Sequence, residues 1–163
     1  MTITLAPRTA AHVSIYWNKT QDEEIRRLLP SAAQSEEQAL ERFRQSLLPG
    51  ASSFGRIILV DGRYVGDIWC YCIDEKEEKS AMLSYCIFEK SCWNQGIGTK
   101  AAALFLELVF ERYSIDKIGA FTYASNQPSI RVLEKLGFDF MEEWEENGVL
   151  SRYFQRKRNS FTK

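Results

Sequence analysis

Residues 92–100 read CWNQGIGTK, with two glycines one residue apart directly ahead of an alanine- and leucine-rich run that predicts a helix. Glycine costs a helix interior about 1 kcal/mol relative to alanine. A helix N-terminus offers N–H groups without internal partners and about half a positive charge, so an anion such as a phosphate can bind there. Alternatively, Asn94 caps the helix and the glycines relieve crowding against the preceding strand. These residues alone leave both interpretations open.

Two common phosphate-binding motifs do not match this stretch. Gly98, Thr99 and Lys100 resemble the end of a P-loop, but that motif requires lysine before serine or threonine. A dinucleotide-binding fingerprint requires a third glycine three residues after the second, where this chain has Ala101, and its context would be parallel strands. A different class of phosphate ligand is therefore favoured.

A second polar stretch, SNQPSIRVLEKLGF, follows the next predicted strand. A ligand crossing the start of the glycine-containing helix would reach it. Together, LSYCIFEKSCWNQGIGTKAA and ASNQPSIRVLEKLGF resemble the GNAT superfamily of acyl-CoA-dependent N-acetyltransferases, and in particular the branch that acetylates ribosomal-protein N-termini. The resemblance covers roughly residues 54 to 145. It implies acetyl-CoA as the acetyl donor and a primary amine as the acceptor.

The resemblance implies a set of coenzyme A-binding residues. The family pattern Q/R-x-x-G-x-G/A opens the central helix and surrounds the pyrophosphate with backbone N–H groups; it maps onto Trp93 through Gly98, and tryptophan is common at the first position in this branch. Thr99 is expected to contact a phosphate, and the strand before the motif to pair with the pantetheine arm. The implied residues are Cys86, Ile87, Phe88, Trp93, Asn94, Gln95, Gly96, Ile97, Gly98, Thr99, Asn126 and Ser129.

The catalytic residues are less clearly marked. Many family members have a tyrosine seven residues after the asparagine to protonate the leaving thiolate, but this chain has Leu133 there. Ser129, where this branch often has serine, is the candidate group near the sulfur, or else only a first-turn hydroxyl. A backbone N–H near Ile87 or Phe88 is the candidate oxyanion donor. Asp67 interrupts the apolar strand RYVGDIWCY and is a candidate base, with Glu89, the glutamates of residues 142–146 or a water chain as alternatives.

Composition narrows the class of protein. The 163 residues predict a single N-acetyltransferase domain over residues 1–163, and 45% hydrophobic with 26% charged residues is typical of a globular protein. A net charge of -1 disfavours nucleic-acid binding. With no apolar span or leader, we expect a cytoplasmic protein that does not enter membranes. Four cysteines with one histidine fit buried small side chains, and no metal site is expected.

The order of elements predicts an α/β (α+β) fold. TITLAP predicts a strand, TAAHVSIYW a helix capped by Thr9, and SEEQALERFRQSLLPG a second helix that starts at Ser35 with acidic residues following. Residues 54–88 predict three antiparallel strands. A helix with Ile97, Ala101, Leu104, Phe105 and Leu108 on its apolar face, a strand, another helix and a hairpin complete the chain. The expected architecture is a GNAT-like, twisted, mostly antiparallel mixed sheet flanked by helices and splayed between its fourth and fifth strands.

The predicted function is transfer of an acetyl group from acetyl-CoA to a primary amine, either a protein N-terminus or a small molecule, by direct attack on the thioester. A catalytically inactive acyl-CoA-binding or regulatory module is the alternative, because the usual tyrosine is absent. The acidic stretch MEEWEEN is expected either to attract a cationic acceptor or only to solubilise a hairpin. Exposed-looking aromatic residues also permit a homodimer.

Overall fold

Seven strands form one sheet in the computed structural model, which describes residues 1–29 and 32–158. The strands are β1 (Ile3–Ala6), β2 (Phe54–Val60), β3 (Arg63–Asp74), β4 (Ser80–Ile87), β5 (Lys117–Tyr123), β6 (Asp139–Glu146) and β7 (Val149–Lys157). Their spatial order is β1-β2-β3-β4-β5-β7-β6. Only β4 and β5 pair in parallel, so the predicted mixed, mostly antiparallel sheet is confirmed.

Two of the helices, α1 and α3, begin at capping residues that are recognisable in the sequence. They are α1 (Ala10–Lys19), α2 (Glu23–Arg26), α3 (Glu36–Ser46), the 3-10 turn η1 (Lys90–Cys92), α4 (Ile97–Arg112) and α5 (Gln127–Lys135). The Thr9 hydroxyl accepts from the N–H of His12, and the Ser35 hydroxyl accepts from the N–H of Gln38. These bonds satisfy donors that have no partner inside the helix. The predicted caps of α1 and α3 are confirmed.

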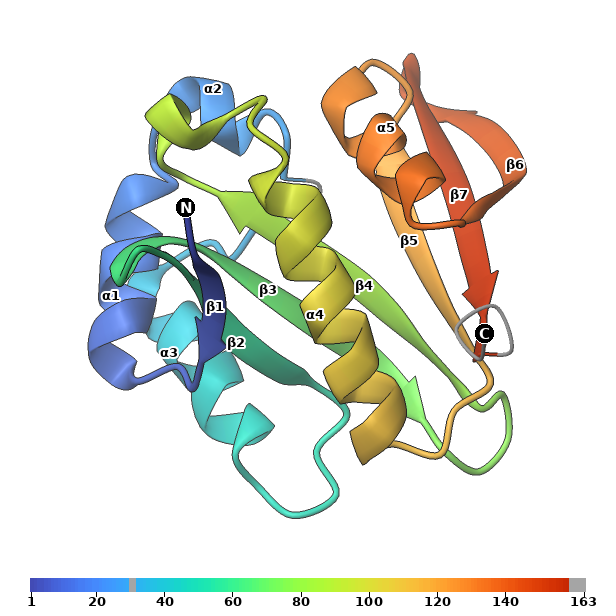
Figure 1. Cartoon of the computed structure of the whole chain (residues 1–163), viewed down its shortest axis with the longest axis horizontal. Coiled ribbons are helices and arrows are strands. Elements are labelled where there is room, and N and C mark those ends of the chain that lie inside the picture. Colours follow the sequence, from blue (N-terminus) through green and yellow to red (C-terminus); the bar gives the residue numbers. More distant parts are fainter. Residues whose placement is uncertain (30–31, 159–163) are drawn as a thin grey trace.

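The helices cover the two faces of the sheet unequally (Figure 1). Helix α4 crosses one face over β3 and β4, and α5 packs on the same face over β5 and β7. Helices α1 and α3 pack on the opposite side, where Tyr16 of α1 meets Trp69 of β3 edge to face. The main core lies between α4 and the sheet and includes the fully buried Ile68, Phe105 and Ile118.

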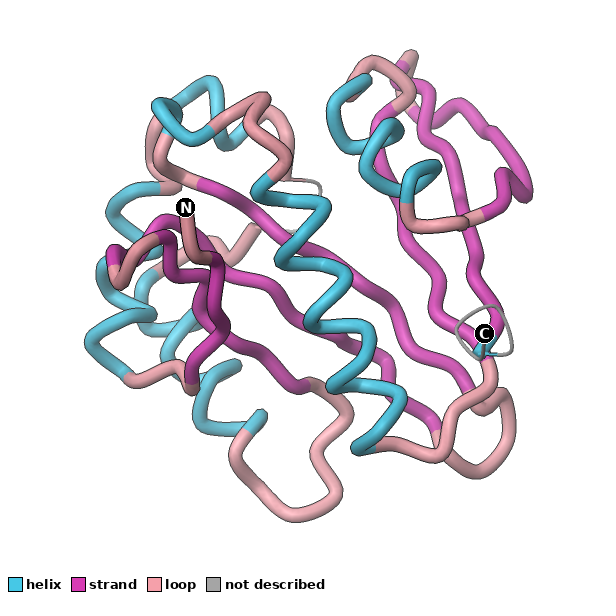
Figure 2. Tube along the Cα trace, in the orientation of Figure 1, coloured by secondary structure: helices cyan, strands magenta, loops and turns pink. Residues whose placement is uncertain are grey.

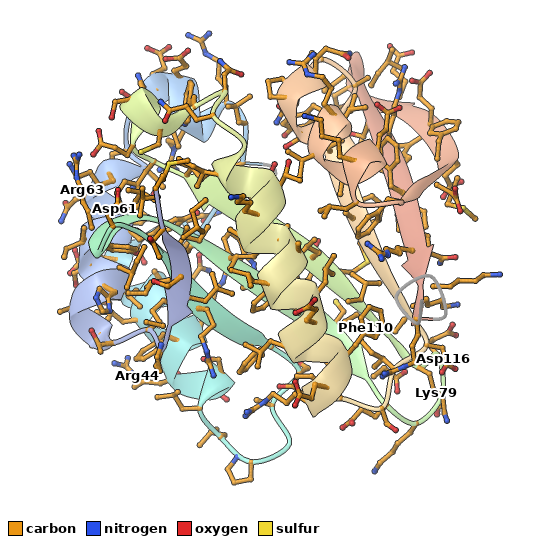
Figure 3. All side chains as sticks on the ribbon, viewed as in Figure 1. Arg44, Asp61, Arg63, Lys79, Phe110 and Asp116 are labelled. Carbon is orange, nitrogen blue, oxygen red and sulfur yellow. The ribbon has the colours of Figure 1, made fainter. Side chains whose placement is uncertain are left out.

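Strands β4 and β5 start together and then separate. Their pairing is confined to the register Ser80↔Lys117, Ala81↔Ile118 and Met82↔Gly119. Lys79 and Asp116 lie side by side just before the strands (Figure 3), and the N–H of Asp116 donates to the carbonyl of Lys79 at 2.7 Å. Beyond Met82 the two traces diverge toward the start of α4 (Figure 2). The sheet is therefore splayed between its fourth and fifth strands, as predicted.

One predicted helix face is rotated in the structure. Leu104 was expected to be buried, but its side chain is 42% exposed, while Ala102, Leu106 and Val109 are buried. Leu104 and Ala102 lie on opposite sides of the shared stripe through Ala101 and Phe105, and the sheet beneath decides which side is covered. The short helix α2 was not predicted. Among the described residues no helix is long and apolar enough to span a membrane.

Candidate active site

The N-terminus of α4 opens without a side-chain cap. Gly96 is the N-cap residue, with a φ of 78° in the left-handed region that glycine adopts without steric cost, and open space surrounds the position a Cβ would occupy. Asn94, the cap considered from the sequence, lies two residues earlier with a φ of 62°. The backbone N–H groups of the first turn therefore stay available to an anion.

The second glycine has a different purpose. A Cβ at Gly98 would lie 3.2 Å from Cε2 of Tyr85 and 3.4 Å from its hydroxyl oxygen. Gly98 is buried and Tyr85 is half-buried, so the tyrosine ring lies directly against the first turn of α4. The crowding interpretation therefore holds at Gly98, while Asn94 does not cap the helix. Anion binding at the start of α4 stays a prediction.

The backbone of β4 presents its peptide groups alternately to β3 and to the splay. The N–H of Phe88 donates to the carbonyl of Val65 at 3.0 Å, which places residue 88 in a hydrogen-bonded pair with β3. Because antiparallel pairs alternate, Tyr85 and Ile87 direct their peptide groups away from β3. In the described strands β5 has no register partner for them. The N–H of Ile87, rather than that of Phe88, is therefore the candidate oxyanion donor.

Trp93 fixes the end of this strand against the start of α4. Its indole Nε1 donates to the carbonyl of Ile87 at 2.8 Å. That bond uses the carbonyl of Ile87 and leaves its N–H for a ligand. The indole thereby fixes the distance between the exposed strand edge and the turn through Asn94 and Gly96.

Helix α5 brings a second N-terminus to the splay. Asn126 is its N-cap, and Oδ1 of Asn126 accepts from the N–H of Ser129 at 3.3 Å. Asn126 therefore caps α5, and its amide nitrogen is left as the group for a ligand. The Ser129 side chain lies near the Tyr85 hydroxyl. Leu133 is buried, as expected for a residue that fills the site of the absent tyrosine.

These elements enclose a cleft of about 660 Å³ between β4, β5 and the starts of α4 and α5. It collects most of the residues predicted to bind coenzyme A. The predicted residues that line it are Cys86, Ile87, Trp93, Asn94, Gly96, Ile97, Gly98, Thr99, Asn126 and Ser129. Their roles remain predictions. The sequence reasoning missed Tyr85, Arg131 and Lys135, which also line the cleft.

Three predicted site residues lie elsewhere. The side chain of Gln95 turns back to donate to the carbonyl of Ser91. Phe88 is buried in a separate apolar cluster with Ile25 and Cys86. Asp67 is 0% exposed and lies outside the set of residues that line the cleft.

Asp67 belongs to a buried polar network. Nη1 of Arg8 donates to its Oδ2 at 3.0 Å, and the hydroxyl of Tyr64 donates to its Oδ1. Burial raises the pKa of Asp67, while the Arg8 guanidinium and the Tyr64 hydroxyl act in the opposite direction. A Cβ at Gly55 would meet the Arg8 guanidinium, so this glycine provides the space for the pair. A catalytic role for Asp67 remains a prediction, and it would require access that this geometry does not provide.

The side chains that line the cleft include two cations and one carboxylate, Glu24, and the start of α4 adds partial positive charge. Arg131 and Lys135 of α5 line it together with the N-terminus of α4. Burial raises the pKa of the Cys86 thiol to about 12. This thiol is therefore neutral at pH 7 and forms an apolar part of the cleft lining. Across residues 1–29 and 32–158, no group of three or more His, Cys, Asp or Glu side chains is placed to hold a metal ion.

A parallel strand pair that opens beside an uncapped, glycine-started helix defines the acetyltransferase class of fold, and comparison with known proteins agrees. Residues 2–139 match the family described as the acetyltransferase (GNAT) domain. The chain therefore belongs to the GNAT acetyltransferase domain family.

Individual relatives are more distant. Human alpha/beta-tubulin-N-acetyltransferase 9 is 26% identical over 156 residues, which cover 84% of this chain and 72% of the relative. Aminoglycoside acetyltransferase AAC(6')-Ib in complex with coenzyme A superposes with a TM-score of 0.81 at 20% identity, covering 99% of this chain and 98% of that one. Mycobacterium smegmatis RimJ in complex with CoA-disulfide gives a TM-score of 0.81 at 18% identity, covering 99% and 84%. At these identities the two structures establish the fold alone.

Proposed function

We propose that residues 1–163 form one N-acetyltransferase domain that transfers the acetyl group of acetyl-CoA to a primary amine by direct attack on the thioester. The observation that carries the proposal is the uncapped N-terminus of α4 opening into the cleft beside the unpaired edge of β4. The N–H groups of residues 96–99 bind the pyrophosphate, with Arg131 and Lys135 adding positive charge. The pantetheine arm pairs with the edge of β4 at Tyr85 as an added strand, because the carbonyl of Ile87 already accepts from Trp93.

The acetyl group then lies deep in the splay. The N–H of Ile87 stabilises the oxyanion of the tetrahedral intermediate, because this donor has no partner in the sheet. The amine arrives neutral and attacks the carbonyl carbon, the C–S bond breaks, and coenzyme A leaves as the thiol after gaining a proton. Ser129 and Asn126 line the part of the cleft where the sulfur and the pantetheine arm pass.

The acceptor is a primary amine of a protein N-terminus or a small molecule. The tubulin acetyltransferase among the relatives supports a protein acceptor, and the aminoglycoside enzyme among the structural neighbours supports a small one. A cytoplasmic location and a homodimer remain predictions from the sequence. The acceptor class follows from one experiment: the purified chain is mixed with acetyl-CoA and peptides with free N-termini, polyamines or aminoglycosides, and release of free thiol is followed.

The alternative function is an acyl-CoA-binding module without turnover. Leu133 in place of the usual tyrosine favours it. Thiol release that depends on one class of amine would establish transfer and exclude this alternative. Acetyl-CoA binding by calorimetry with no amine-dependent release would establish the binding module instead.

Cysteine alkylation tests the location of the coenzyme independently of turnover. Cys92 is half-buried and lines the cleft, whereas Cys72 is exposed on β3 outside it. We expect saturating acetyl-CoA to slow alkylation of Cys92 by iodoacetamide at least tenfold and to leave Cys72 unchanged, because only the first thiol is covered. Peptide mass spectrometry over time measures both rates in one sample. Equal rates at Cys92 with and without acetyl-CoA would contradict the assigned cleft.

A further inference from the structure

The proposed reaction leaves one proton unassigned. When the C–S bond of acetyl-CoA breaks, the leaving thiolate requires a proton donor in the cleft. The position from which a tyrosine of α5 would supply it is Leu133, whose side chain is only 3% exposed. The cleft instead contains a tyrosine on β4, the strand that faces α5 across the splay.

That phenol is Tyr85 of β4. It lies past Met82, the last residue of β4 that pairs with β5, so its ring stands at the splay rather than within the paired sheet. It lines the cleft from the face of the sheet that carries α4 and α5. Its ring packs on Gly98 at the start of α4, and Ser129 at the start of α5 lies near its hydroxyl.

We propose that Tyr85 is the general acid of this chain and protonates the coenzyme A thiolate, with Ser129 holding and re-protonating its hydroxyl. This inference rests on the proposed acetyl transfer. The phenol O–H bond breaks and an S–H bond forms as the C–S bond breaks. The phenolate then recovers, through Ser129 or water, the proton that the attacking amine releases. Acetyl-CoA and amine thus become amide and coenzyme A thiol, with no proton gained or lost.

The surroundings of Tyr85 favour both steps, the donation of the phenol proton and its later recovery. Burial raises the pKa of Tyr85, so the hydroxyl carries its proton at neutral pH and is an acid rather than a base. The neighbouring Ser129 side chain acts in the opposite direction on this pKa, because its hydroxyl can donate to the transient phenolate. The positive ends of α4 and α5 also favour negative charge at this point. The sequence alone did not suggest Tyr85, because it precedes the glycine motif and reads as a core residue of the strand.

The test compares Tyr85→Phe, Ser129→Ala and the double variant with the wild type. Tyr85→Phe keeps the ring on Gly98, so we expect unchanged acetyl-CoA affinity and a single-turnover rate reduced 10- to 100-fold. Ser129→Ala should reduce the single-turnover rate three- to tenfold. The double variant should be no slower than Tyr85→Phe alone, since Ser129 acts through Tyr85. Tyr113→Phe, outside the cleft, is the matched control and should turn over normally.

A solvent deuterium isotope effect separates acid catalysis from packing. We expect an effect of about two or more on the wild-type single-turnover rate and a smaller one in Tyr85→Phe. A Tyr85→Phe variant that binds acetyl-CoA and turns over within twofold of the wild type overturns the inference while leaving the proposed transfer intact. Loss of coenzyme affinity in Tyr85→Phe together with additive costs in the double variant also overturns it. If the wild type transfers no acetyl group to any amine, the proposed function fails, and the inference with it.

Discussion

Replacement of Thr99 by glutamate is expected to abolish useful coenzyme A binding without destabilising the protein. Thr99 is the third residue of α4 after the N-cap Gly96, and its half-buried side chain lines the cleft. A glutamate at this helix position is favourable for folding, because it lies at the positive end of the helix dipole. The same carboxylate would stand where the pyrophosphate binds, and like charges a few ångströms apart repel by about 4 kcal/mol near a protein surface.

We therefore expect the Kd for acetyl-CoA to rise at least 30-fold in Thr99→Glu, with an unchanged or higher Tm. Thr99→Gln is the matched control: it has the same size without the charge and should raise the Kd no more than about fivefold. Calorimetry at two salt concentrations measures the Kd of each variant for acetyl-CoA. Higher salt should reduce the difference between the two Kd values, because it screens the added charge. Position 99 is better suited than position 98, because a side chain at Gly98 would displace Tyr85. Equal affinity in the two variants would remove the pyrophosphate from the start of α4.

The second large effect is expected on stability, at Asp67. Its carboxylate is fully buried against the guanidinium of Arg8, whose side chain is 17% exposed. Removing one partner of such a pair leaves the other charge buried and uncompensated, which costs about 3–5 kcal/mol. Nε of Arg8 is already buried without a hydrogen-bond partner among the described residues, so the guanidinium has little else to bind. Asp67→Ala should therefore unfold at a much lower urea concentration.

Replacing both charges tests this account. Arg8→Met combined with Asp67→Leu should recover most of the loss, because apolar side chains of similar volume need no counter-charge. Arg8→Met alone should resemble Asp67→Ala. Urea unfolding of the wild type, Arg8→Met, Asp67→Leu and the double variant gives the coupling free energy. Additive losses in the double variant would mean that the two side chains do not stabilise each other.

A further variant, Asp67→Asn, compared with Arg8→Met, decides whether Asp67 is also a base. We expect Asp67→Asn to bind acetyl-CoA normally when folded, since Asp67 does not line the cleft. A base role would add a steep loss of kcat/KM at neutral pH that Arg8→Met, at matched stability, does not show. Similar turnover in the folded fractions of the two variants would leave Asp67 a structural role only.

Several features of the fold and of the candidate site could be predicted from the sequence, because they depend on residues close together in the chain. Thr9 and Ser35 cap helices wherever they precede an amphipathic run, and both predicted caps are present. Gly96 requires a left-handed backbone at one position of the chain, so its meaning was also local. The choice between a ligand and crowding at Gly98 was not local, because it depended on a tyrosine thirteen residues earlier.

Asp67 and Leu104 show where sequence reasoning fails. A lone carboxylate in an apolar strand indicates a special environment, but only the fold shows whether it faces a cleft or an arginine 59 residues away. The periodicity of α4 predicts an apolar stripe, but the neighbouring strands decide which edge of that stripe is covered. Tyr85 was hidden for the same reason: its partners Gly98 and Ser129 belong to two other elements.

Residue types at short spacing along the chain were sufficient to predict the order of the strands and the main helices, the start of α4 and the membership of the acetyltransferase family. Which residues share the cleft depends on contacts between distant parts of the chain. The separation of β4 from β5 beyond Met82 brings the starts of two helices, far apart in the chain, to one strand edge. The burial, ion pairing and solvent access of a side chain depend on residues that are far apart in the sequence. Local sequence patterns therefore do not predict them.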